Sequence, residues 1–145
     1  MNCLVWNCRG LGNPRTVRKL GDFIQAKDIS VVFVAETWTD EARLDQILRD
    51  IDFDNKWVVT REGRKGGLAF FWKSLVDLMV EDSSNYYIDT WIDKNKESEW
   101  RFTGFYSELE TSRRGEAWDS LRSLNHHPNI LWLCTQEKSD SWSKG

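Results

Sequence analysis

The feature that most constrains the fold is an apolar run near the start of the chain that stops at a polar residue. Cys3 to Trp6 are apolar, the run ends at Asn7, and Arg9-Gly10 turns the chain away. Such a run is typical of a buried strand. In open α/β sheets, ligands gather outside the carboxyl ends of the strands. We therefore expect Asn7 to lie at a ligand-binding edge of a sheet.

Other apolar runs end in the same way. They are residues 31–35 before Glu36, residues 102–105 before Tyr106, and residues 130–134 shortly before Glu137. If these strand ends lie at one edge, Asn7 and the three other polar residues form a single cluster. That cluster is the candidate functional site.

Length and composition limit the class of protein. The chain has 145 residues, enough for one modest domain with a core, and its content of 40% hydrophobic and 30% charged residues is typical of a soluble globular protein. No apolar run is long enough to cross a bilayer. The amino terminus lacks a basic region followed by a long apolar segment, so we expect no signal peptide and an intracellular protein.

Charge and cysteine content narrow the class further. A net charge of -3 argues against non-specific nucleic-acid binding by the whole surface, although a local basic loop could still bind nucleic acid. Cys3, Cys8 and Cys134 form no CxxC pair. We expect them to be reduced, buried thiols rather than a metal-thiolate site.

The first half of the chain has the pattern of an α/β unit. Asn13 is placed to cap a helix that starts with Pro14, and Asp28 marks the exit to a strand over residues 29–35 parallel to the first. A second helix starts from Thr39 or Asp40. The apolar residues at helical spacing are Val17, Leu20, Phe23 and Ile24 in the first helix and Leu44, Ile47, Leu48 and Ile51 in the second.

The middle of the chain changes to short β-like runs, which predict a meander of antiparallel hairpins. These runs are residues 57–60, 68–72, 76–80, 86–92 and 100–106. The pair Gly66-Gly67 can adopt the backbone conformations that the turn after residues 61–65 needs. A third helix is expected over residues 112–124 and a last strand over 130–134, while residues 135–145 give no periodic signal and are expected to form a frayed tail. The order indicates a two-layer or sandwich α/β fold.

The expected cluster combines an amide, a carboxylate and a phenol. A carboxylate with amide and water ligands can hold Mg²⁺, while tyrosine and asparagine donate hydrogen bonds to phosphate. Such a site suits metal-assisted phosphodiester cleavage. The alternative is structural: Asn7 starts a turn, Glu36 caps the helix region after Thr37, and Tyr106 is an amphipathic core residue.

Several motifs occur in an order that is typical of one superfamily. They are residues 2–14 (NCLVWNCRGLGNP), 34–37 (VAET), 66–69 (GGLA), 100–106 (WRFTGFY) and 132–134 (WLC). Together they resemble the endonuclease/exonuclease/phosphatase superfamily, most closely the apurinic-endonuclease-like domain of plant LINE-type retrotransposons. The resemblance covers residues 1–134, with residues 135–145 as a divergent polar tail. It implies a DNase I-like, partial four-layer α/β sandwich of two mixed sheets flanked by helices, without its carboxyl-terminal part.

The same resemblance implies hydrolytic nicking of DNA with Mg²⁺ or Mn²⁺. In this likeness Glu36 and Asn7 bind the metal, and Asn7 and Tyr106 contact phosphate. Arg9, Arg113 and Arg114 would contact DNA. For Arg113 and Arg114 a solvated helix start remains an equal alternative.

The chain also departs from the family pattern. After WLC the family continues Ile-Gly-Asp-Phe-Asn, whereas here Glu137 stands at the Asp position with one more methylene and Ser139 replaces the Asn. The Ser-Asp-His motif has no counterpart, and His126 and His127 fit a polar loop before the last strand. We therefore expect a catalytically deficient phosphodiester hydrolase. The alternative is a non-enzymatic retroelement remnant or a module that binds nucleic acid or a partner.

Overall fold

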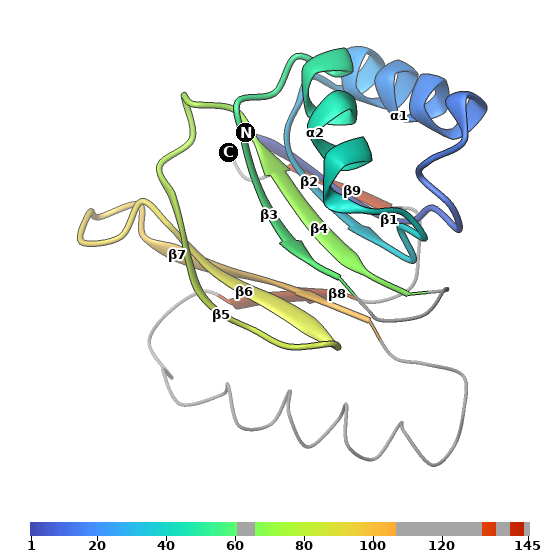
Figure 1. Cartoon of the computed structure of the whole chain (residues 1–145). Coiled ribbons are helices and arrows are strands. Elements are labelled where there is room, and N and C mark those ends of the chain that lie inside the picture. Colours follow the sequence, from blue (N-terminus) through green and yellow to red (C-terminus); the bar gives the residue numbers. More distant parts are fainter. Residues whose placement is uncertain (61–65, 107–131, 136–139, 144–145) are drawn as a thin grey trace.

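The computed structural model describes residues 1–60, 66–106, 132–135 and 140–143, the last two ranges only as backbone strands. These residues form two helices and two sheets (Figure 1). The elements are β1 (Asn2–Asn7), α1 (Pro14–Lys27), β2 (Ile29–Ala35), α2 (Glu41–Asp50), β3 (Asn55–Val59), β4 (Leu68–Trp72), β5 (Leu78–Ser83), β6 (Tyr87–Ile92), β7 (Trp100–Phe105), β8 (Trp132–Thr135) and β9 (Asp140–Ser143).

The predicted strand-helix-strand opening is confirmed. The Asn13 side chain accepts a hydrogen bond from the backbone N–H of Arg15 at 2.9 Å, and Pro14 occupies the first turn of α1. The helix ends at Asp28, whose φ of 49° is left-handed. Strands β1 and β2 are parallel, with Asn7 opposite Ala35. The two strands therefore end at the same edge.

The second helix is capped by Asp40 rather than by Thr39. The Asp40 carboxylate accepts a hydrogen bond from the backbone N–H of Arg43 at 2.9 Å. A carboxylate at this position satisfies a free helical N–H group and also suits the positive end of the helix dipole. Neither described helix is long and apolar enough to span a membrane.

The expectation of one continuous meander is wrong, because the chain changes sheets between β4 and β5. Sheet A has the order β3-β4-β2-β1-β9 and sheet B the order β5-β6-β7-β8. Strand β4 lies between β3 and β2, antiparallel to both, and four of its five residues are buried. A strand that is apolar on both faces needs cover on both sides, so β4 belongs inside sheet A. Both sheets are mixed, as expected, because β1–β2 and β7–β8 are parallel pairs.

The expectation of a frayed tail is wrong for residues 140–143. They form β9, which pairs antiparallel to β1 with Val5 opposite Asp140. Such a pairing uses backbone N–H and C=O groups, so the tail's lack of side-chain periodicity did not reveal it. The last strand expected over residues 130–134 is present as β8, at Trp132–Thr135.

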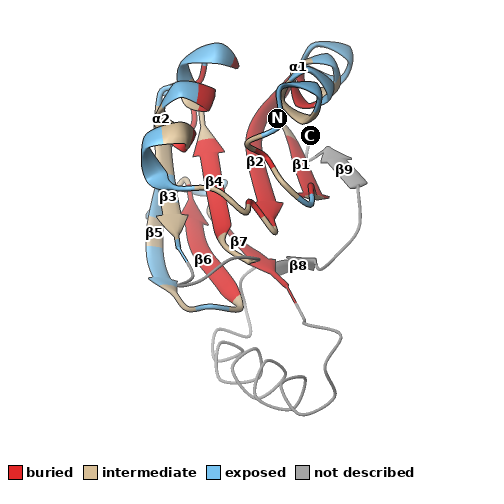
Figure 2. Ribbon diagram, turned by 45° about the vertical axis from the view of Figure 1, so that its right-hand side comes forward, coloured by how far each residue is buried: buried red, intermediate tan, exposed pale blue. Residues whose placement is uncertain are grey.

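Two apolar clusters divide the described residues into layers. One cluster joins α1 and α2 to the outer face of sheet A, and includes Leu20, Ile24, Leu44 and Ile47. The other fills the space between the sheets, and includes Phe33, Phe70 and Phe102. Figure 2 shows the buried central strands of both sheets. The helix expected over residues 112–124 lies outside the described residues, so the fourth layer stays a prediction.

Candidate active site

The strand ends that carry the expected cluster lie at one end of the two-sheet sandwich. Figure 1 shows β1, β2 and β7 ending on its right side, where β4 begins. Glu36 directly follows β2, and Asn7 faces Ala35 across the parallel pair, so Asn7 and Glu36 stand on neighbouring strands. Tyr106 directly follows β7 in the other sheet. We call this end of the sandwich, with its turns 8–11, 36–38 and 66–67, the strand-end rim.

Asn7 has a buried polar atom that the described residues do not satisfy. Its side-chain oxygen Oδ1 is buried and has no hydrogen-bond partner among them. An unsatisfied buried acceptor costs about 1–3 kcal/mol. A site that keeps such an acceptor free is prepared for a ligand that brings a positive charge or a hydrogen-bond donor.

Glu36 sits beside Asn7 on a strained backbone. Its φ is 55°, in the left-handed region that residues with a side chain seldom adopt. The carboxylate is 17% exposed, and its Oε2 lies 3.7 Å from Nε of Arg9, whose side chain is 71% exposed. An ion pair this long and this exposed holds the carboxylate only weakly.

The three turns of the rim are joined by backbone hydrogen bonds. These bonds continue the pairing of the sheet beyond the ends of the strands and run from the 8–11 turn to the 36–38 turn, and from there to Gly66-Gly67. They are Gly10 N–H to Glu36 C=O (2.9 Å), Leu11 N–H to Thr37 C=O (2.8 Å), Thr37 N–H to Gly67 C=O (3.3 Å) and Trp38 N–H to Gly66 C=O (3.1 Å). The backbone around Glu36 is therefore held from both sides.

Cys8 belongs to the 8–11 turn of the rim and is held there as a buried thiol. Its Sγ donates to the C=O of Ala35 at 3.3 Å, and burial raises the pKa of the thiol to about 12. A thiol with that pKa stays protonated at neutral pH when no metal is bound. The predicted burial of Cys3 and Cys8 is confirmed.

Tyr106 is anchored at the same end by the second sheet. It is 8% exposed and belongs to the inter-sheet cluster, together with Ala35 and Leu68 at the adjoining ends of β2 and β4. Its backbone N–H donates to the C=O of Tyr86 at 2.7 Å. The structure thus pairs Asn7 with Glu36 in sheet A and places Tyr106 at the end of sheet B.

The side chains at the rim fit a weakly coordinated hard cation. Asn7 offers an unpaired oxygen and Glu36 a carboxylate, which are the oxygen ligands that Mg²⁺ prefers while it keeps several waters and a substrate phosphate. Among the described residues no three His, Cys, Asp or Glu side chains gather into a metal cluster. Two protein ligands would therefore need water and phosphate to complete the coordination shell.

The other candidate residues lie outside the described residues. This applies to Glu137, Arg113 and Arg114. Sequence reasoning also missed the part that Thr37 and Trp38 play at the rim, where they are bonded to the Gly66-Gly67 turn. The glycine pair was the available signal, since two adjacent glycines permit a close approach of another backbone.

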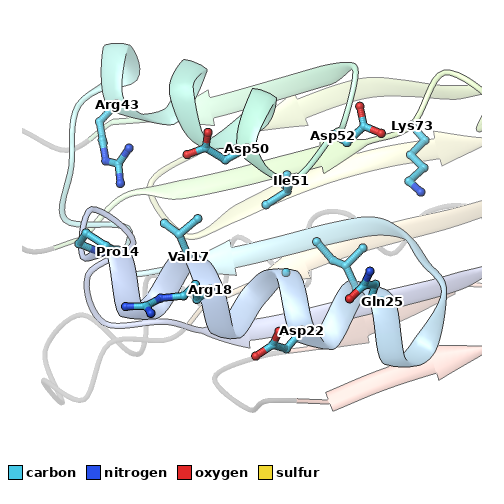
Figure 3. A pocket seen from close by; sticks show the side chains of 12 residues that line it. Pro14, Val17, Arg18, Asp22, Gln25, Arg43, Asp50, Ile51, Asp52 and Lys73 are labelled. Carbon is cyan, nitrogen blue, oxygen red and sulfur yellow. The ribbon is translucent and has the colours of Figure 1, made fainter.

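A groove of about 710 Å³ lies elsewhere, between α1 and α2 on the outer side of sheet A. Figure 3 shows side chains of both helices lining it, with Arg18 and Asp22 on α1 and Asp50 on α2. The candidate site residues that the structure describes, which are Asn7, Arg9, Glu36 and Tyr106, do not line this groove.

With this geometry established, comparison with known proteins identifies the family. The model of the endonuclease/exonuclease/phosphatase family matches residues 4–140. The chain belongs to this family. The resemblance found in the motifs is thereby confirmed at the family level. No curated protein sequence matches the chain significantly.

Solved structures show the same fold. TDP2 from Caenorhabditis elegans aligns with a TM-score of 0.60 and 15% identity over 94% of this chain and 46% of TDP2. The 3′ phosphatase NExo from Neisseria, bound to a product DNA hairpin, aligns with a TM-score of 0.62 and 12% identity over 92% of this chain and 56% of NExo. The endonuclease domain of the telomere-specific non-LTR retrotransposon TRAS1 aligns with a TM-score of 0.59 and 11% identity over 92% and 57%.

These alignments establish the α/β architecture of two sheets and two helices as DNase I-like. The chain spans about half the length of the structures that it matches. Identities this low show the fold alone.

Proposed function

We propose that this chain carries the metal-binding and phosphate-binding part of a divalent-metal-dependent phosphodiesterase that acts on DNA. The observation that carries the proposal is the unpaired, buried Oδ1 of Asn7 at the end of β1, with Glu36 directly after the paired end of the neighbouring strand β2. Asn7 and Glu36 would hold Mg²⁺ or Mn²⁺. The ion, when bound, would stabilise negative charge that develops on the phosphate.

The side chains have separate tasks in this proposal. Asn7 would hold the cation through its Oδ1, and its amide N–H₂ would then be left to donate to a phosphate oxygen. The Tyr106 hydroxyl is a second donor to phosphate. Arg9, which is largely exposed beside Glu36, adds positive charge where a nucleic-acid backbone would approach. Asn7 ends β1 and Tyr106 directly follows β7, so the backbone of both residues is fixed by the two sheets.

Low turnover is part of the proposal. Glu137 and Ser139 stand where the family pattern has Asp and Asn, and the 145 residues contain no Ser-Asp-His motif. A carboxylate displaced by about 1 Å costs roughly a hundredfold in rate. We therefore expect this polypeptide to bind metal and phosphate better than it cleaves.

DNA is the proposed ligand because of two structural matches. NExo binds a product DNA hairpin, and the TRAS1 domain is the endonuclease of a non-LTR retrotransposon. The motif pattern supports an origin in a plant LINE-type element for this chain. Arg113 and Arg114 remain candidates for DNA contact.

The test compares wild type with Glu36→Gln, which removes the charge and keeps the shape. We expect Mn²⁺ binding, followed by electron paramagnetic resonance, to weaken at least roughly tenfold in the variant, since even residues that only support a metal ligand change affinity by that factor. Glu41→Gln is the matched control, because Glu41 is an exposed carboxylate that pairs with Lys56. Equal Mn²⁺ binding by all three proteins would contradict the proposed metal site.

A plasmid-nicking assay with Mg²⁺ distinguishes the hydrolase from the second candidate function, which is DNA binding without cleavage. The substitutions at Glu137 and Ser139 favour a module that binds DNA without cutting it. Slow nicking that is lost in Glu36→Gln supports the hydrolase. Equal background nicking by both proteins, with DNA binding intact in a mobility-shift assay, supports the binding module.

A further inference from the structure

We infer that Gly10 and Gly67 form a glycine clamp that sets the position of the Glu36 carboxylate. They would be positioning residues that act through Thr37 and Trp38 and do not touch metal or substrate. The inference rests on the proposed function of Glu36 as a metal ligand. It gives a role to the Gly66-Gly67 pair, which the proposed chemistry leaves unexplained.

The turn that carries Glu36 needs external support. Glu36 has a φ of 55° and Trp38 a φ of 51°, so two of its three residues are left-handed and neither is glycine. Residues with side chains hold such conformations only where their surroundings enforce them, and they gather at functional sites. The support for this turn should therefore be visible in its neighbours.

Gly67 supplies support on one side. Its φ is 93°, and a Cβ built on it would lie 2.5 Å from Oγ1 of Thr37. The Thr37 side chain is 2% exposed, and the Thr37 N–H donates to the C=O of Gly67 at 3.3 Å. The side chain of Thr37 thus fills the space that any other residue at position 67 would need.

Gly10 supplies support on the other side. Its φ is 109°, and a Cβ there would lie 3.2 Å from Cε3 of the Trp38 indole. The Gly10 N–H donates to the C=O of Glu36 itself at 2.9 Å. The clamp therefore holds both residues that follow Glu36 and also the backbone of Glu36.

A side chain at either glycine should move the carboxylate. With alanine at position 67, Thr37 Oγ1 would have to retreat by about 0.9 Å to reach an ordinary contact of 3.4 Å. Thr37 is 2% exposed and is the next residue after Glu36, so any backbone shift of Thr37 that relieves this contact also moves Glu36. Residues that orient a metal ligand typically change metal affinity by roughly 10–100-fold when altered.

The experiment measures Mn²⁺ affinity by electron paramagnetic resonance in Gly67→Ala, at a temperature where its circular-dichroism melt shows a folded protein. We expect a loss of roughly 10–100-fold. Gly21→Ala is the control for a glycine-to-alanine change without a contact, since a Cβ at Gly21 meets no atom within 4 Å, and the double variant below controls for the strain that a φ of 93° adds to alanine at position 67. Gly10→Ala should show a smaller loss, because its closest approach is longer.

A double variant separates positioning from general damage. In Thr37→Ala/Gly67→Ala the clashing hydroxyl is gone, and the nearest remaining atom is the C=O of Val59 at 3.5 Å. We expect this protein to bind Mn²⁺ more tightly than Gly67→Ala alone. A double variant no better than the single one would overturn the clamp.

The controls also separate this inference from the function on which it depends. If wild type binds Mn²⁺ and Glu36→Gln does not, while a folded Gly67→Ala binds like wild type, the clamp is wrong and the metal site stands. If wild type and Glu36→Gln bind equally, the metal site itself fails. Should Gly67→Ala not fold, Thr37→Ala decides, because loosening the turn lowers affinity if the clamp acts and leaves it unchanged if not.

Discussion

Two regions of the molecule, the strand-end rim and the groove between α1 and α2, differ in whether their side chains are poised to bind a ligand. The groove has a volume of about 710 Å³ and is lined by charges of both signs on α1 and α2, including Arg18, Asp22 and Asp50. Its helices carry regular caps. Left-handed backbone occurs in both regions, at Glu36 in the rim and at Asp52 in the groove, but the rim adds an unpaired buried oxygen on Asn7. A groove between two helices carries no such cost by itself, whereas an unsatisfied buried acceptor lowers stability by about 1–3 kcal/mol.

That difference predicts a division of labour. The helix layer should determine how stable the chain is, because its apolar cluster joins α1 and α2 to sheet A. The rim should determine what the chain binds, at some cost in stability. Substitutions in the two regions should therefore move different measurements.

The largest effect is expected in the helix layer. Leu20 on α1 is 0% exposed within the apolar cluster. Leu20→Ala should lower the free energy of unfolding by about 2–5 kcal/mol, from lost burial and the cavity left behind. Urea titration measures this loss. Mn²⁺ affinity, measured below the unfolding transition, should equal that of wild type, and a parallel drop would break the division between the two regions.

Asn7→Leu should change the other measurement: it should lower Mn²⁺ affinity without lowering the stability of the chain. Mn²⁺ affinity should fall by at least roughly tenfold, since an oxygen ligand is lost. Stability without metal should stay the same or rise by up to about 1 kcal/mol, because the unsatisfied acceptor disappears. Asp50→Asn in the groove serves as the control and should leave Mn²⁺ affinity unchanged. A destabilised Asn7→Leu with normal metal binding would assign Asn7 a structural role in its turn.

Gly21→Ala tests the groove itself. Gly21 lies within α1 and lines the groove, and a Cβ there meets open space. Alanine should raise the free energy of unfolding by about 0.5–1 kcal/mol, because glycine is the poorer helix former. Thermal melting measures the gain. Any change in Mn²⁺ or DNA binding would mean that the groove takes part in function.

Much of the fold was predictable because local signals agreed with tertiary packing. The cap at Asn13, Pro14 in the first turn and the apolar spacing of α1 all indicate one helix, and the structure has it. The change of sheet after β4 was not predictable from hairpin signals, because strand order depends on which strand needs cover on both faces. Strand β9 was missed because backbone pairing with β1 leaves no side-chain pattern.

The site was predictable to a smaller extent. The polar residues at the strand ends predicted that Asn7 and Glu36 lie at the ends of neighbouring strands, and the parallel pairing of β1 with β2 shows this placement, while their role stays a prediction. The left-handed backbone of Glu36 and the contact of Gly67 with Thr37 depend on which turns meet in space. A single sequence names the residues of such a contact and does not show that they touch.

The smallest effect is expected at Arg9. Replacing it tests whether its guanidinium and a metal ion compete for the Glu36 carboxylate. Arg9 lies 3.7 Å from the Glu36 carboxylate with its side chain 71% exposed, so the guanidinium competes with a metal for the same charge. Exposed pairs contribute about 0.2–1 kcal/mol, which limits the gain in Mn²⁺ affinity of Arg9→Gln to about fivefold. The same substitution should weaken DNA binding, most clearly at low salt, if Arg9 contacts phosphate. Mn²⁺ titration and a mobility-shift assay at two salt concentrations measure both effects. Weaker Mn²⁺ binding in Arg9→Gln would show instead that Arg9 holds Glu36 in place for the metal, as an extension of the clamp.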